Sequence, residues 1–166
     1  MNKKAVSPLI ATVLLIAFAV ALGAVVMNGG RTYVEDTADK ARVTSDTKVT
    51  CSMDIRMEYL TLNGVKQICY NESQDMISFT VVNTGTMKIE KLQAKVYGSK
   101  SIYVNSSLDN SSISASYPLK TNITYDFDNY GDIQKVSLTP AIKVSGLNDP
   151  VLCADNSLDQ EDIREC

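Results

Sequence analysis

The chain has 166 residues, of which 45% are hydrophobic and 21% are charged, a composition typical of one globular domain. Histidine is absent, which argues against serine-histidine hydrolases, most zinc enzymes and haem proteins with histidine ligands. The formal net charge of −3 argues against a nucleic-acid-binding protein, because neutralising phosphates requires a basic surface. We therefore expect no enzymatic activity, no cofactor and no nucleic-acid partner.

The apolar residues are concentrated near the N-terminus. The segment 5–27 is an uninterrupted uncharged run, and apart from Lys3 and Lys4 every charge lies at Arg31 or later. As a helix this run is long enough to cross a hydrocarbon layer of about 30 Å at about 1.5 Å per residue. The two lysines in front of it predict that Met1 is cytoplasmic and that the C-terminal domain lies outside.

Three interpretations of the apolar run compete. The first is a secretory signal peptide cut at a small-x-small pattern such as Ala17-Phe18-Ala19, although the run continues beyond the usual apolar length of about 7–15 residues. The second is a permanent single-span anchor, which would make the protein a monomeric membrane-anchored extracellular binding domain. The third depends on the residues that precede and open the run.

The segment KKAVSPLIATVLLIAFAVALGAVV closely resembles the N-terminus of archaeal type IV pilins and their archaellin relatives. In that family a prepilin peptidase removes a short basic leader, the class III signal peptide, and Lys3, Lys4 and Ala5 match its end. The resemblance implies cleavage between Ala5 and Val6 and assembly of identical subunits into a helical homopolymer, a pilus or archaellum. It also implies a membrane platform protein and an assembly ATPase as partners, insertion in the cytoplasmic membrane before assembly, and an extracellular filament that serves adhesion or motility.

Exposure of the large apolar side chains to water would cost on the order of 20 kcal/mol or more, so outside lipid this helix must pack among others. Small residues could let neighbouring backbones approach closely: Ala17, Ala21 and Ala24 on one face, and Ala19 and Gly23 on a face that we take to be adjacent. Alanine is equally a good helix former. The residues expected to pack in a filament core are Leu9, Ile10, Val13, Leu14, Leu15, Ile16, Phe18, Val20, Leu22, Val25 and Val26.

The segment after the apolar run predicts a polar extension of the helix. We expect a bend or unwinding at Asn28, Gly29 and Gly30, because each glycine weakens a helix by about 1 kcal/mol; a simple linker is the alternative. From Val49 to Tyr59 apolar and polar residues alternate, which predicts a half-buried strand.

Turn and strand patterns continue to the C-terminus. Asn63-Gly64 predicts a hairpin turn, and further strands are expected in MISFTVVN, IEKLQAKVYG, NITYDFD and IQKVSLTPAIKV, the last interrupted by Pro140. Seven or eight strands result. The predicted fold class is α+β, a long N-terminal hydrophobic helix followed by an antiparallel immunoglobulin-like β-sandwich, with a leader over residues 1–5, the helix over 6–46 and the extracellular domain over 47–166.

Four cysteines lie in the polar part, without the histidines or CxxC pairs of a zinc site. Two disulfides are the better interpretation, and they indicate an oxidising compartment. Of the three possible pairings we favour Cys51 with Cys69 and Cys153 with Cys166, because each pair encloses a short turn-bearing segment.

Polar motifs of the predicted domain point to modification rather than to metal binding. Sequons of the type N-x-Ser/Thr predict N-glycosylation at Asn71, Asn105, Asn110 and Asn122. Near the C-terminus the oxygens of Asp155, Ser157, Asp159 and Glu161 have the alternate spacing of a calcium loop, but Gln160 stands where an EF-hand needs glycine. No metal site is predicted.

Overall fold

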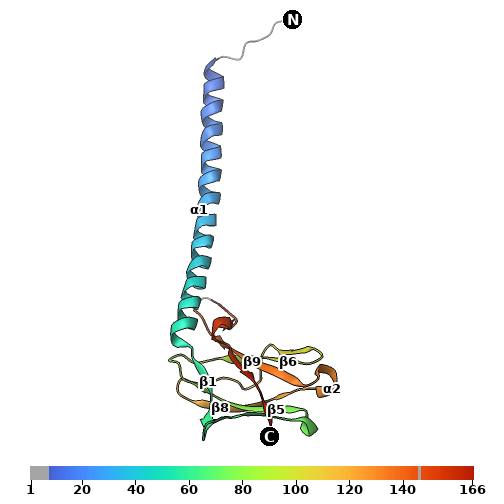
Figure 1. Ribbon diagram of the computed structural model, residues 1–166. Helices are drawn as coiled ribbons and strands as arrows, with labels where there is room; N and C mark the ends of the chain where they lie inside the picture. Colours follow the sequence, from blue (N-terminus) through green and yellow to red (C-terminus); the bar gives the residue numbers. More distant parts are fainter. Residues whose placement is uncertain (1–7, 146) are drawn as a thin grey trace. The chain divides into compact units, whose positions relative to one another are not determined.

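The computed structural model describes residues 8–145 and 147–166, except for the side chains of residues 8, 9, 36, 39 and 40. The chain divides into two compact units, Met1–Arg42 and Val43–Cys166. One helix, α1 (Pro8–Asp54), contributes its longer N-terminal part to the first unit and its last turns, from Val43 onward, to the second. Figure 1 shows α1 and the strands that follow it. The predicted α+β class is confirmed.

The part of α1 in the first unit is helical throughout the described residues. The backbone of Asn28, Gly29 and Gly30 is helical, in contrast to the unwinding expected there. Two glycines weaken a helix by about 1 kcal/mol each, but unwinding would break several consecutive backbone hydrogen bonds. The side chain of Thr32 also bonds back, with Oγ1 donating to the Asn28 carbonyl at 3.1 Å. Propagation of the helix from both sides therefore prevails over the local glycine preference.

The last turns of α1 replace the strand that was expected to begin at Val49. The helix ends at Asp54, and Cys51 is buried. Residues that are at least half-buried recur three or four positions apart, at Val43, Thr47, Thr50 and Cys51, which is the helical period. The pattern of burial therefore matches the alternation of apolar and polar residues only from Ile55 onward. The prediction of a strand over residues 49–54 is wrong, because packing against the rest of the domain buries residues at helical spacing and stabilises the helix.

The first sheet is built around β5 (Met76–Asn83). Strand β8 (Pro118–Thr124) pairs with one edge of β5, and β1 (Met57–Tyr59) and β4 (Ile68–Asn71) share the other edge. All three pair antiparallel to β5, whereas β12 (Arg164–Glu165) pairs parallel to β4. A hairpin of β2 (Thr61–Leu62) and β3 (Val65–Lys66) lies between β1 and β4 in the sequence.

That hairpin confirms the turn predicted from Asn63-Gly64. Asn63 has φ 51° and Gly64 has φ 80°, so both central residues adopt the left-handed backbone that the two-residue turn requires. Asparagine and glycine are the residues that adopt it at least cost.

The second sheet is built around β9 (Ile133–Ile142), which pairs along one edge with β6 (Lys91–Gly98). Strand β7 (Ile102–Asn105) pairs with the far edge of β6. Strands β10 (Val151–Leu152) and β11 (Leu158–Glu161) share the other edge of β9, and every pairing in this sheet is antiparallel. Short helices complete the unit: η1 (Glu72–Gln74), α2 (Phe127–Tyr130) and η2 (Ala154–Asn156).

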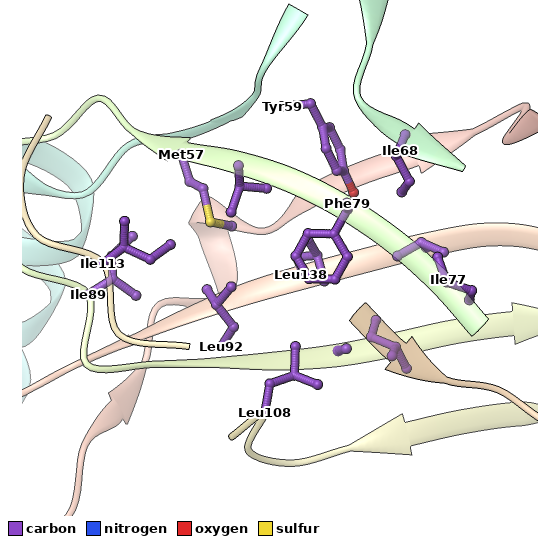
Figure 2. Close-up of a cluster of buried hydrophobic side chains, with 14 of the residues drawn as sticks. Met57, Tyr59, Ile68, Ile77, Phe79, Ile89, Leu92, Leu108, Ile113 and Leu138 are labelled. Atoms are coloured by element: carbon purple, nitrogen blue, oxygen red, sulfur yellow. The ribbon is translucent and has the colours of Figure 1, made fainter. Parts of the chain in front are cut away.

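The two sheets contribute to a single hydrophobic core. On β5 the buried residues Ile77, Phe79 and Val81 alternate with partly exposed ones, and β6 and β9 bury Leu92 and Leu138 in the same cluster. Figure 2 shows Ile77, Phe79, Leu92 and Leu138 within one cluster of buried side chains. An alternating apolar face on each sheet explains why the two sheets stack, since each buries its face against the other.

Pro140 does not interrupt the last long strand, contrary to expectation. Strand β9 passes through it, and Pro140 lies opposite Leu92 in the ladder. The Leu92 amide donates to Ser111 Oγ at 2.9 Å and the Leu92 carbonyl accepts from the Leu108 amide at 2.8 Å, so Leu92 makes its bonds away from β9. Because no hydrogen bond from Pro140 to β6 is required at this pair, proline is tolerated inside the strand.

The strand expected over residues 122–128 ends early. Strand β8 stops at Thr124, and Asp126 caps α2, with Oδ1 accepting from the Asn129 amide at 2.9 Å. Tyr125 is fully buried in the connection, and its hydroxyl donates to the Gly131 carbonyl at 2.9 Å. The cap and the buried tyrosine turn the chain before the alternating pattern ends.

The four cysteines form two disulfides, as predicted, but the favoured pairing is wrong. Cys51 is bonded to Cys153 and Cys69 to Cys166, with Cα–Cα distances of 5.4 and 5.0 Å. The first bridge joins the end of α1 to the segment after β10, and the second joins β4 to the C-terminal residue beside β12. Sheet pairing, which brings distant segments together, decides the connectivity, whereas the length of the intervening sequence does not.

Candidate membrane and assembly helix

The N-terminal part of α1 is apolar on all sides. The segment Ile10–Glu35 has a mean hydropathy of 2.8 and is long and apolar enough to cross a membrane. Its large apolar side chains from Ile10 to Met27 are each 50–79% exposed. A helix that is apolar all around requires an apolar environment on every side, either lipid or other helices. This helix can therefore anchor the chain in a membrane.

The length of the apolar part matches a bilayer. Residues 8–27 span about 30 Å as a helix, the thickness of a hydrocarbon core. Beyond them α1 becomes polar, with an ion pair between Arg31 Nε and Glu35 Oε1 at 3.2 Å, one helical turn apart. Ion pairs of this kind occur on exposed helix surfaces, where they contribute little stability. The part of α1 that follows the apolar residues is therefore expected to face water.

The small residues of the apolar helix lie on two narrow strips of its surface, here called thin faces. At about 100° per residue, Ala17, Ala21 and Ala24 cluster on one face, and Ala19 and Gly23 lie roughly 150° away. The expectation that these faces are adjacent is therefore wrong, since they are nearly opposite. A Cβ atom at Gly23 would meet nothing within 4 Å. Most large side chains fill the two flanks between the thin faces, with Leu14, Leu15, Phe18, Leu22, Val25 and Val26 on one flank and Val13, Ile16, Val20 and Met27 on the other. Ile10 lies on the same side as Ala17 and Ala21, so that thin face begins after Ile10.

The residues of the predicted leader, Lys3, Lys4, Ala5 and Val6, lie outside the described residues. Leu9 is in the helix, but its side chain is likewise outside the description. The other residues expected to pack in a filament core are brought onto one continuous helix.

The joint between helix and sheets is the part of the candidate site that the sequence prediction missed. Asp54 closes α1 with its carbonyl accepting from the Thr86 amide at 2.9 Å, and its Oδ1 accepts from Thr86 Oγ1 at 2.8 Å. Gly85 is required here, because a Cβ atom would lie 2.2 Å from the Asp54 carbonyl oxygen. The signal that could have located this joint is the spacing of Val43, Thr47 and Cys51.

Two oxygen-bearing side chains of the acidic C-terminal segment are bonded to residues of β9. Asp159 Oδ2 pairs with Lys135 Nζ at 2.5 Å, and Ser157 Oγ lies 2.8 Å from Thr139 Oγ1. Burial acts to raise the pKa of Asp159, but hydrogen bonds from Lys135 and Ser137 lower it, and the net pKa lies below the ordinary value. In the part of the chain that is described, no group of three His, Cys, Asp or Glu residues is placed to hold a metal ion.

The four sequons occupy different environments. Asn110 and Asn122 are exposed, whereas Asn71 and Asn105 are half-buried. Asn71 also uses its side chain internally, with Nδ2 donating to Gln74 Oε1 at 3.2 Å and Oδ1 accepting from Ser73 Oγ at 2.7 Å. Asn105 Oδ1 accepts from the Ser107 amide at 3.1 Å. The exposed pair is therefore more accessible to a modifying enzyme.

Comparison of the chain with models of known protein families finds no match. Comparison with curated proteins likewise finds none.

Proposed function

We propose that the chain is a structural subunit of an extracellular helical filament of the archaeal type IV pilus superfamily, a major pilin or archaellin that serves adhesion or motility and catalyses no reaction. The observation that carries the proposal is the exposed apolar helix, which follows a sequence resembling a prepilin leader and precedes a disulfide-bonded domain. The two disulfides favour a compartment outside the cytoplasm.

Packing supports assembly of this helix with more than one neighbour. A single thin face would favour a dimer, whereas two nearly opposite faces of small residues allow close approach of helices from two sides. Transfer of the helix from lipid to a filament core gains little hydrophobic energy, because both environments are apolar. Close packing along those faces is therefore the term that would favour the filament.

Strand order supports an immunoglobulin-like sandwich for the exported domain. The first sheet has the order β1-β5-β8 and the second β11-β9-β6-β7. If β1, β5, β6, β7, β8, β9 and β11 take the roles of strands A, B, C, C′, E, F and G, this arrangement corresponds to the ABE and GFCC′ sheets of that fold. The added β4 and β12 would then be an extension of the first sheet beside strand A.

The decisive experiment identifies the mature N-terminus and the assembly state together. The protein is purified from the membrane and from the medium of its host, its N-terminal peptide is measured by mass spectrometry, and the medium is examined by electron microscopy. We expect a peptide that begins at Val6 in filaments. A membrane-bound monomer with Met1 retained would favour the single-span anchor with a binding domain, and a start after Ala19 or Ala21 would indicate a signal peptide.

Variants test the leader directly. Replacing Lys3 and Lys4 with serine, or Ala5 with phenylalanine, should block processing and leave full-length protein in the membrane, since these residues match the family's cleavage motif. Lys91→Ser is the matched control, because Lys91 is an exposed lysine on β6. Normal filament yield from the leader variants would contradict the proposal.

A further inference from the structure

Strand β8 is the longest strand that has a partner on only one side. It pairs with β5 along its whole length, and within residues 8–145 and 147–166 no strand pairs with its other edge. The other strands with a single sheet neighbour are all shorter. An unpaired edge of this length is a template for pairing with another chain.

The backbone groups that β8 presents to solvent follow from the bonds of β5. The Thr80 amide donates to the Gln67 carbonyl and the Thr80 carbonyl accepts from the Leu60 amide, so Thr80 makes its bonds on the side of β1 and β4. The alternation of an antiparallel ladder then directs the odd-numbered residues of β5 to β8. Because Lys120 lies opposite Thr80 and Asn122 opposite Ser78, the amides and carbonyls of Lys120 and Asn122 face away from the sheet.

The two halves of this edge are protected unequally. The first half has Pro118, which lacks an amide hydrogen, and Lys120, a charged residue; both are known means of blocking an edge. The second half, residues 121–124, reads Thr-Asn-Ile-Thr, which is uncharged and rich in β-branched residues. The sequon Asn122-Ile123-Thr124 lies in that half.

Asn122 is accessible. Ile123 is buried in the core, so its neighbours Asn122 and Thr124 point to the opposite, outer face, where both are exposed. The Asn122 side chain has no hydrogen-bond partner among the described residues, unlike that of Asn71. The nitrogen that would be modified is therefore not held by another group.

We infer that Asn122 is N-glycosylated and that its glycan guards the unprotected half of the β8 edge against pairing with β8 of a second copy. In the transfer, Asn122 Nδ2 bonds to the anomeric carbon of an oligosaccharide carried as a glycosyl ester of a lipid phosphate. The carbon–oxygen bond to the phosphate breaks, the lipid phosphate leaves with the electron pair, and the amide proton passes to it through solvent. A bulky, hydrated group then stands beside the outward-facing backbone of the strand.

The inference rests on export of the domain and does not require a filament. Copies crowded in a membrane or along a filament would present many identical β8 edges to one another. Antiparallel pairing of two such edges would join any two neighbouring copies, whatever their intended arrangement. A glycan excludes such pairing by its volume and keeps the edge hydrated.

The test uses the full chain, expressed in a host that glycosylates N-x-Ser/Thr sequons and purified in detergent micelles. Tryptic cleavage after Lys120 and Lys135 releases residues 121–135, which contain one sequon, and mass spectrometry of this peptide should show an attached glycan. Thr124→Ala removes the sequon and leaves Asn122 in place. We expect this variant to lose the glycan and to lose the monomer peak in size-exclusion chromatography with light scattering.

Three control variants distinguish protection of the β8 edge by the Asn122 glycan from a general effect of glycans on solubility. Thr124→Ser keeps the sequon and should remain glycosylated and monomeric, and Ser73→Ala removes the Asn71 sequon away from this edge and should remain monomeric. Asn122→Lys lacks the glycan but places a charge at the edge, so it should also remain monomeric. An unmodified 121–135 peptide in protein glycosylated elsewhere would overturn the assignment, and a monomeric Thr124→Ala variant would overturn the guarding role.

Discussion

Removal of both disulfides should destabilise the domain by more than the sum of the two single removals. Each bridge alone closes a long loop, with sequence separations of 102 and 97, and a loop of that size is worth about 4.7 kcal/mol in the chain-entropy model. With one bridge in place, the other closes a much smaller ring, which contains only the segments from Cys51 to Cys69 and from Cys153 to Cys166. A ring of roughly 30 residues is worth about 3.7 kcal/mol.

The expected losses in the free energy of unfolding are therefore about 3.7 kcal/mol for one cysteine pair replaced by alanine and about 8.4 kcal/mol for all four, with a coupling of about 1 kcal/mol. The second value is comparable to the whole stability of a typical domain, so the quadruple variant should be largely unfolded at 37 °C. Urea denaturation of residues 43–166, followed by circular dichroism, measures each variant. The fragment begins at the boundary between the two compact units and, when produced in a host that glycosylates Asn122, should be a soluble monomer.

Two outcomes would refute the reasoning. If the quadruple variant lost no more stability than a single-pair variant, loop closure would not be the source of the stabilisation. If the losses were about 3 kcal/mol each and strictly additive, the bridges would be closing two separate short rings, as the pairing expected from the sequence would do.

Three further predictions concern single residues. Leu15→Asp should abolish filament formation, because an unpaired charge costs at least roughly 2.5–3.5 kcal/mol at the centre of a membrane helix and recurs in every subunit; normal filaments in electron micrographs would contradict the buried role. Gly98→Ala should lower Tm strongly, because a Cβ atom there would lie 2.1 Å from the Tyr130 carbonyl oxygen, whereas Gly29→Ala should stabilise α1 by about 1 kcal/mol; equal thermal melts would disprove the steric argument. Asp159→Asn should lower Tm slightly at pH 7, because the lowered pKa of Asp159 means that its ionised form stabilises the fold above the unfolded pKa of about 3.9. This contribution disappears as the pH falls through the folded pKa, so the difference in Tm between variant and parent should shrink in progressively more acidic buffer. A difference in Tm that did not change with pH would exclude the ion pair with Lys135 as its cause.

Local signals in the sequence were sufficient where neighbouring residues alone determine the structure. The left-handed turn at Asn63-Gly64 needs no tertiary contact to be favoured, and the alternation of β5 matches its burial residue by residue. The pattern from Val49 to Tyr59 was ambiguous, because Cys51 and Ile55 satisfy both a period of two and a spacing of four. Contacts of the last turns of α1 resolved it in favour of the helix, and the spacing of Val43, Thr47 and Cys51 is the local signal that agrees with them.

The candidate site was predictable in kind but not in geometry. Composition alone located the apolar helix, because about twenty apolar residues in succession without a charge cannot be accommodated in water. The near-opposite placement of Ala19 and Ala21 follows only when each residue is given its angle on the helix. The disulfide pairing depended on which strands become neighbours, and the contact of β12 with β4 joins segments that are far apart in the sequence.

The crossed bridges also determine how the disulfide-bonded domain would respond to a pulling force. Tension between α1 and the C-terminal residue can follow two covalent paths. One crosses the disulfide from Cys51 to Cys153 and continues along the chain to Cys166. The other runs along the chain from Cys51 to Cys69 and crosses the second disulfide to Cys166. At about 3.5 Å per residue the shorter path, through the 5.4 Å bridge to Cys153, can be no longer than about 50 Å, against roughly 400 Å for an unbridged chain from Cys51 to Cys166. Residues 70–152 lie outside both paths. Most of the two sheets would therefore carry no load while α1 was pulled away from the C-terminal residue.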